Sequence, residues 1–192
     1  MLQLDFARPA RFPCELSARR QILVINGHPD PRPERFCAAL CDAYEDGARR
    51  GGWDVRRLDV GSLSLGASDF ETDTGQDAAV AKILWARRLT IVYPLWLDQP
   101  PEIVRMLFAK VQQRKPRGPG SAPLPVRAVI TMEMPAFAHR TLMGEGGEIG
   151  RRIAIPGLEV RSPSFIGAVN LIPADERRTW LCRMHTFGMA GR

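Results

Sequence analysis

The stretch "ILVINGHPDPRPERFCAAL", residues 22–40, brings positive and hydrogen-bonding side chains to one short turn. A strand-like apolar run ends in Asn-Gly, and a helical pattern starts near Pro33. The backbone N–H groups of such a turn, together with the helix dipole, form a site for an anion. His28, Arg32 and Arg35 add charge and hydrogen-bond donors to it. Phosphate binding is one interpretation, and a rigid turn with exposed arginines is the other.

The stretch "YPLWLDQPPEIVRMLFAKV", residues 93–111, offers a different chemistry. A buried strand that ends in Pro-Leu-Trp places a large flat apolar surface and free backbone groups at the edge of a sheet. This arrangement suits a planar ring that is held partly by backbone contacts. The alternative is that Trp96 packs over the helix that follows, a common fate for an aromatic residue at this position.

Neither stretch contains the G-x-G-x-x-G fingerprint or the Walker pattern, so nothing indicates nucleotide hydrolysis or a dinucleotide fingerprint. The segment "GEGGEIG", residues 144–150, is rich in glycine but fails the spacing of the fingerprint and follows no clear strand. Its two glutamates would repel phosphate. We interpret it as a turn beside the site, and we expect residues 135–161 to decide substrate access. No residue pattern predicts a metal site.

The elements that must position these stretches alternate along the chain. Strands are expected at 22–26, 54–60, 89–96, 126–132 and 164–169, of which the first and third are apolar enough to be covered on both faces. Helices are expected at 33–50, 77–88, 101–113 and 175–188. This alternation predicts a doubly wound parallel sheet with helices on both faces. In such sheets ligands bind at the carboxyl ends of the strands. In this chain a ligand site is therefore expected in the loops just after Asn26, Tyr93 and Thr131.

Composition and charge exclude a transmembrane protein and argue against nucleic-acid binding. The chain has 192 residues, 45% of them hydrophobic and 25% charged, which is typical of a soluble globular protein. No apolar run approaches the roughly 18 residues that span a bilayer. The net charge of +6 is spread in arginine pairs along the chain, which indicates solvated faces rather than a nucleic-acid stripe.

The four cysteines show neither a C-x-x-C pair nor zinc-ligand spacing. Cys37 and Cys41 are expected to share one helix face as core residues, and all four to be free thiols of a cytosolic protein. Residues 1–20 are basic and lack the apolar region of a signal peptide. We expect them to form a poorly ordered N-terminal arm, and residues 21–192 to form one domain.

The first two stretches together resemble the flavodoxin-like NAD(P)H:quinone oxidoreductase family, which includes the modulator-of-drug-activity and potassium-efflux ancillary reductases. The resemblance lies in "ILVINGHPDP...F..AL.DAY..GA...G..V..LD" and in "VYPLWLDQPPEIVRMLFAKV", and covers about residues 21–113. It implies an α/β fold, the flavodoxin-like three-layer sandwich with a five-stranded parallel sheet in the order 2-1-3-4-5.

The resemblance also implies which residues meet a flavin in the first two loops. His28 and Phe36 match the flavin phosphate loop, and Arg35-Phe36-Cys37 stands where relatives often have Ser-Phe-Asn. Arg35 is therefore expected to replace a polar contact to the cofactor. The segment that runs along the flavin ring is matched by Pro94, Leu95, Trp96 and Leu97.

The third loop departs most from the family. Relatives commonly carry Thr-Thr-Gly-Gly after the fourth strand, and then a tyrosine that helps relay charge or protons at the flavin. Here the positions of Thr-Thr-Gly-Gly are occupied by Thr131, Met132, Glu133 and Met134, and His139 aligns with the tyrosine. We expect these four residues at the cofactor, with Glu133 adding a negative charge. His139 is a candidate catalytic residue that hydrogen-bonds or moves a proton, or else an exposed loop residue.

The resemblance implies an enzyme, an NAD(P)H dehydrogenase (quinone)-like flavoprotein reductase. Hydride would pass from NAD(P)H through bound FAD, or alternatively FMN, to a quinone or similar two-electron acceptor. A cytoplasmic homodimer with no nucleic-acid partner and no membrane insertion is expected. The alternative, motivated by the altered loops, is a non-catalytic regulatory or binding subunit that holds flavin weakly or not at all. DNA binding is a third reading.

Overall fold

The computed structural model describes residues 20–63, 74–96, 99–114, 124–135, 159–160 and 163–192. The arm predicted for residues 1–20 lies outside this part except for Arg20. Within the described residues one parallel sheet forms from β1 (Gln21–Asn26), β2 (Asp54–Asp59), β3 (Arg88–Pro94), β4 (Pro125–Thr131), β5 (Glu159–Val160) and β6 (Ser164–Ile166).

The strand order β2-β1-β3-β4-β5 confirms the predicted order 2-1-3-4-5. The fifth position is shared by two short strands, because both β5 and β6 pair with β4. β5 pairs with the first two residues of β4, and β6 with Val129, Ile130 and Thr131 at its carboxyl end. The sequence predicted only the second of these strands, since the short Glu159–Val160 segment has no period of its own.

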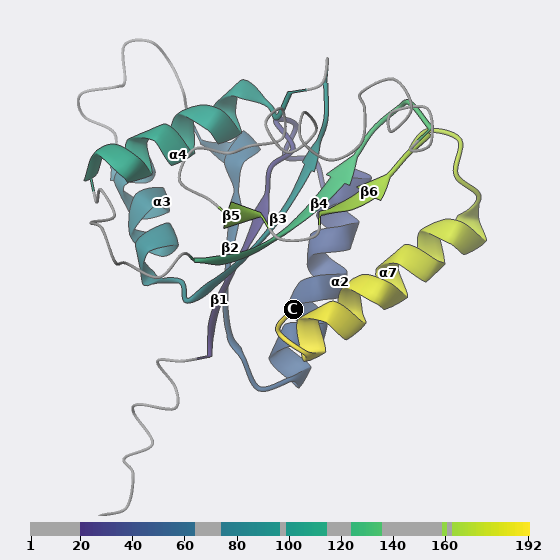
Figure 1. Cartoon of the computed structure of the whole chain (residues 1–192), viewed down its shortest axis with the longest axis horizontal. Helices are drawn as coiled ribbons and strands as arrows, with labels where there is room; N and C mark the ends of the chain where they lie inside the picture. Colours follow the sequence, from purple (N-terminus) through teal and green to yellow (C-terminus); the bar gives the residue numbers. More distant parts are fainter. Residues whose placement is uncertain (1–19, 64–73, 97–98, 115–123, 136–158, 161–162) are drawn as a thin grey trace, which may run out of the picture.

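Helices cover both faces of the sheet and make three layers (Figure 1). One face carries α2 (Phe36–Arg50) and α7 (Ala174–Met189), and the other carries α3 (Thr74–Trp85) and α4 (Glu102–Arg114). A short 3₁₀ turn, η1 (Val60–Ser62), follows β2. No helix in the described part of the chain is long and apolar enough to cross a membrane.

The hydrophobic pattern of β1 explains why helices are needed on both faces. Successive side chains of a strand point to opposite sides. Leu23 and Ile25 pack toward α3 and α4, whereas Ile22 and Val24 pack toward α2 and α7, and all four are fully buried. A continuous apolar run is therefore the pattern of a strand with no solvent face, as predicted.

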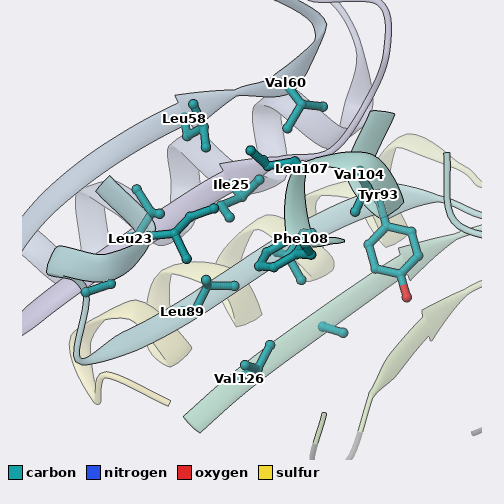
Figure 2. Packing of buried hydrophobic residues seen from close by; sticks show 14 of the residues in the cluster. Leu23, Ile25, Leu58, Val60, Leu89, Tyr93, Val104, Leu107, Phe108 and Val126 are labelled. Carbon is teal, nitrogen blue, oxygen red and sulfur yellow. The ribbon is translucent and has the colours of Figure 1, made fainter. Parts of the chain in front are cut away.

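The core between the sheet and α4 is shown in Figure 2. Val104, Leu107 and Phe108 of α4 pack on Leu23 and Ile25 of β1, with Leu58, Val60, Leu89 and Val126 around them. Tyr93 belongs to the same cluster and is fully buried, and burial raises the pKa of its hydroxyl. This core holds the carboxyl ends of β1 and β3 in register beside α4.

On the other face, α2 packs along α7 through small residues. The carbonyl oxygen of Tyr44 would lie 2.1 Å from a Cβ at Gly188, so only glycine allows this close approach. Cys37 and Cys41 are buried here as predicted, and burial raises the pKa of Cys37 to about 11. Cys182 is exposed on α7.

Two predicted boundaries were wrong in ways that matter for function. The first helix begins at Phe36, not at Pro33, because residues 32–35 form a turn closed by Arg35 N donating to Arg32 O at 3.2 Å. The third strand ends at Pro94, and Trp96 instead forms an isolated antiparallel bridge with Gln99. Both stretches therefore carry longer loops at the carboxyl edge of the sheet than the sequence suggested.

Candidate functional site

A cavity of about 380 Å³ lies at the carboxyl edge of β1, β3 and β4. We call it the edge cavity. Its walls come from the β1–α2 loop, the start of α2, the end of β3, the end of β4 and the β6–α7 segment. The lining residues are His28, Asp30, Glu34, Arg35, Phe36, Cys37, Pro94, Leu95, Trp96, Thr131, Met132, Glu133, Val169, Asn170 and Arg177.

The chain leaves β1 through a tight, buried turn. Gly27 N donates to Val92 O at 2.7 Å, and a Cβ on Gly27 would come within 2.7 Å of Tyr93 Cβ. The buried Asn26 side chain donates to Asp59 Oδ1 at 3.0 Å and accepts from His28 N at 3.2 Å. Because the polar atoms of Asn26 are paired, it can stay buried and fix the direction of the loop.

His28 is held as a defined tautomer. Its Nδ1 accepts a hydrogen bond from Asp30 N at 3.0 Å, so the neutral ring carries its proton on Nε2. Partial burial, with the positive charge of Arg35 second, lowers the pKa of His28 below its ordinary value. The ring meets Trp96 edge-on, with centroids 5.9 Å apart. At neutral pH His28 therefore adds a donor to the edge cavity and no charge.

Asp30 joins both loop arginines. Arg32 Nε and Nη2 donate to Asp30 Oδ2 at 2.9 and 2.6 Å, and Arg35 Nε donates to the same oxygen at 2.8 Å. Arg35 Nη2 also contacts this oxygen. These hydrogen bonds hold the pKa of Asp30 well below its ordinary value. The charge of Arg35 is consequently paired with that of a carboxylate in its own loop.

The wall formed by residues 94–96 differs from the sequence expectation. Leu95 N donates to Thr131 O at 2.7 Å, and Trp96 N and O pair with Gln99 at 3.1 and 3.0 Å. These backbone groups, which were expected to be free, are therefore used within the protein: Leu95 N extends the pairing of β3 with β4, and Trp96 bonds to Gln99 where the chain folds back. The Trp96 side chain lines the edge cavity and is 47% exposed. Leu97 lies outside the described residues.

The end of β4 forms the floor. Thr131 is buried, and its Oγ1 lies 3.4 Å from the sulfur of Cys37. Met132 is also buried, and its N–H donates to Ile166 O at 2.9 Å. Glu133 accepts a hydrogen bond from Asn170 Nδ2 at 3.3 Å. Met134 is not a lining residue; it is 39% exposed, and its carbonyl accepts from Ala168 N.

Arg177 of α7 is a lining residue that sequence reasoning missed. Its Nη2 donates to Val169 O at 2.7 Å and its Nε to Ile172 O at 3.4 Å, and its guanidinium stacks on the Phe36 ring, 5.0 Å from the centroid. The pair Arg177-Arg178 looked like an ordinary solvated face. The sequence did hold one indication of this role. Arg177 lies two residues after the expected helix start, and a short loop separates that helix from a strand that ends at the same sheet edge.

The first helix begins at the edge cavity without a side-chain cap and without an acidic residue in its first turn. Arg35 directly precedes α2, and the Arg177 guanidinium stacks on the ring of Phe36, the first residue of the helix. Three carboxylates oppose these two positive charges in the lining, at Asp30, Glu34 and Glu133. At the start of α2, the helix dipole and two arginines are offset by Asp30 and Glu34. The edge cavity combines this charged end with an apolar wall at Pro94–Trp96, and Glu133 adds a negative charge just after β4.

Most of the predicted site residues meet in this one cavity, namely His28, Arg35, Phe36, Pro94, Leu95, Trp96, Thr131, Met132 and Glu133. Met134 lies beside it. Leu97 and His139 lie outside the described residues, as do residues 136–158 and 161 of the expected access segment. Their roles stay predictions. Asp30, Glu34, Cys37, Val169, Asn170 and Arg177 join the set only through the tertiary structure.

A doubly wound parallel sheet in the order 2-1-3-4-5, with a cavity at the carboxyl ends of its strands, is the arrangement of a flavodoxin-like α/β protein. Residues 20–149, more than half of the chain, match the family model described as a flavodoxin-like fold. The chain belongs to this family, which confirms the family prediction made from the two motifs. A comparison with curated proteins gives no significant match.

Solved structures share the fold at low sequence identity. The NAD(P)H:quinone oxidoreductase from Methanothermobacter marburgensis superposes with a TM-score of 0.65 at 14% identity, over 90% of this chain and 96% of that one. An NADPH-quinone reductase from P. pentosaceus gives 0.62 at 13%, over 88% and 97%. An NADH:FMN oxidoreductase in its apo form gives 0.61 at 14%, over 89% of both chains.

Proposed function

We propose that the protein is a flavin-dependent oxidoreductase that takes electrons from NAD(P)H and reduces a quinone or a similar two-electron acceptor. The observation that carries the proposal is the edge cavity, where a positive helix start and an exposed tryptophan face the same space. The names of the similar structures, two quinone reductases and an NADH:FMN oxidoreductase, support the same class.

The chemistry of the lining fits a flavin. An isoalloxazine ring is flat and largely apolar, and Pro94, Leu95 and Trp96 offer a wall of that character. A flavin phosphate needs donors and positive charge. The start of α2, which has no side-chain cap, offers backbone donors, and Arg35 and Arg177 add positive charge. We assign Thr131, Met132 and Glu133 to the remaining side of the ring.

A bound flavin supplies the two-electron redox chemistry, accepting hydride from NAD(P)H and reducing the acceptor. The residues of the chain would bind the flavin and orient it. Trp96 excludes water from one face, and His28 offers its Nε2 hydrogen as a neutral donor. Glu133 disfavours additional negative charge nearby, so it should make the bound cofactor harder to reduce. His139 is proposed as the residue that hydrogen-bonds or moves a proton.

The finer assignments follow the family resemblance. We propose FAD as cofactor with FMN as the alternative, and a cytoplasmic homodimer. Exposed apolar side chains near the edge cavity support self-association, because Trp96, Met134 and Leu171 are 47%, 39% and 83% exposed. Light scattering on the purified protein tests the dimer, and chromatography of the extracted cofactor separates FAD from FMN.

Absorption spectroscopy of the purified protein tests the proposal directly. We expect flavin bands, or their appearance after incubation with FAD or FMN, and bleaching of these bands by NADPH under anaerobic conditions. Addition of menadione as a probe acceptor should restore the oxidised spectrum. A folded, colourless protein that takes up neither flavin would refute the proposal.

The second candidate is a non-catalytic flavodoxin-fold subunit with weak or no flavin binding. Two observations favour it. Asp30 already occupies Arg35, and the N–H groups of Leu95 and Trp96 are already bonded within the protein. Flavin uptake without NADPH-dependent bleaching would support this candidate over the enzyme.

A further inference from the structure

The Asp30 carboxylate pairs with both arginines of the β1–α2 loop, and its Oδ1 also accepts from Arg32 Nε at 3.0 Å. Asp30 Oδ2 receives donors from both Arg32 and Arg35, and the Asp30 side chain is 25% exposed. On Arg35 both donors, Nε and Nη2, belong to the same edge of the guanidinium. Arg35 lines the edge cavity and is 42% exposed, whereas Arg32 is 65% exposed.

This edge of the guanidinium is valuable for recognising phosphate. Arginine binds carboxylate and phosphate most strongly with two parallel N–H groups, and Nε with Nη2 form one such pair. A phosphate that approaches Arg35 in this way meets an edge already bonded to Asp30, and it must displace the carboxylate. An aspartate of ordinary pKa is already ionised at neutral pH, and the two arginine partners lower the pKa of Asp30 further. The competition is therefore permanent under physiological conditions.

We propose that Asp30 is a specificity-determining residue of the edge cavity, where its carboxylate competes with a phosphate-bearing ligand for Arg35. In terms of the proposed function, on which this part rests, Asp30 sets the preference between phosphorylated and unphosphorylated flavin. A ligand without phosphate can bind while the Asp30–Arg35 ion pair stays intact. FMN gives up part of its phosphate binding energy to break it.

Glu34 provides a matched control on the same loop. Its carboxylate also lines the edge cavity, but it forms no ion pair with the described residues. Glu34→Gln removes the same charge from the same cavity without releasing Arg35. Asp46→Asn is a second control, because Asp46 pairs with Arg50 near the other end of α2 and does not line the cavity.

Dissociation constants for FMN and riboflavin, measured by fluorescence titration, test the proposal. Asp30→Asn should tighten FMN binding about fivefold, the order expected when exposed ion pairs of this kind no longer compete. Riboflavin binding should change less than about twofold, because riboflavin has no phosphate. Glu34→Gln should give a smaller gain for FMN than Asp30→Asn, and Asp46→Asn should give none.

A double variant shows whether the effect passes through Arg35. In an Arg35→Gln background, Asp30→Asn should no longer favour FMN over riboflavin. Asp30→Ser serves as the second variant if the asparagine disturbs the turn, and it should shift FMN binding in the same direction. Thermal unfolding of each variant checks that the fold is intact.

Weaker FMN binding in both folded variants, or equal gains for FMN and riboflavin, overturns the proposal. Inorganic pyrophosphate separates this failure from failure of the proposed function. If the parent binds neither flavin, the flavin assignment fails, and calorimetric titration with pyrophosphate then decides the role of Asp30. Tighter pyrophosphate binding by Asp30→Asn than by the parent supports competition for Arg35, and equal or absent binding in both overturns it.

Discussion

Removal of the Trp96 side chain probes the ring-binding wall. The indole lines the edge cavity, is 47% exposed and meets only the edge of His28 among the aromatic rings described. Its backbone bridge to Gln99 does not need the side chain. Trp96→Ala should therefore lower the free energy of unfolding by about 1 kcal/mol, within the ordinary range for a point mutation.

The effect on flavin binding should be larger. Stacking of a flat heteroaromatic ring on a protein aromatic side chain contributes about 1–3 kcal/mol. Because the Trp96 residue is only 47% exposed, we take the lower part of this range, about 1–2 kcal/mol. The dissociation constants of FMN and riboflavin should then both rise about 5–30-fold. Both should rise equally, since the two ligands share the ring.

Fluorescence titration of parent, Trp96→Ala and Trp85→Ala is the assay. Trp85 ends α3 at the opposite edge of the sheet, where its ring stacks on the Arg56 guanidinium at 4.0 Å. Trp85→Ala should leave both dissociation constants unchanged. Equal flavin affinity in parent and folded Trp96→Ala would refute the placement of the ring on this wall.

Three further predictions concern charge, packing and pH. Arg177→Gln should weaken FMN binding about fivefold and riboflavin binding little, as for loss of one charged contact; equal weakening of both in titrations would assign Arg177 to packing alone. Phe108→Ala, at a position 1% exposed, should cost about 3–5 kcal/mol in urea unfolding, and a cost below 1 kcal/mol would contradict the core assignment. Folding lowers the pKa of His28 below 6.5, so the unfolded chain binds its proton more readily and stability falls as pH drops below 6.5. His28→Gln should reduce that loss between pH 7.5 and 5.5, and identical pH dependence in urea midpoints would contradict the lowered pKa of His28.

The hydrophobic pattern of short segments was enough to predict the layers of the fold. The apolar run of β1 predicted a strand covered on both faces, because each of its side chains needs an apolar neighbour regardless of which helix provides it. The positions at which the strands end then placed the first two loops and Thr131 at one sheet edge. Those inferences depend only on residue type and period, which are properties of short segments.

The family resemblance named most of the residues that line the edge cavity, but it could not show how they pair. A turn at residues 32–35 stands where a helix start was predicted; Arg35 N closes it on Arg32 O, and the Asp30 carboxylate pairs with both arginines. No sequence period records such a pairing. Similarly, the bond from Leu95 N to Thr131 O joins two strands, and it uses a donor that sequence reasoning left free.

The sequence by itself determined the layers, the sheet edge that carries the loops, and the presence of two arginines in "HPDPRPERF". Only the tertiary structure decided which of those positive charges are already neutralised and that Arg177, more than 140 residues beyond Arg35, faces the same cavity. The physical reason is range. Burial and period act between neighbours in the chain, whereas ion pairs and cavity walls depend on side chains that meet only after the sheet and its helices have packed.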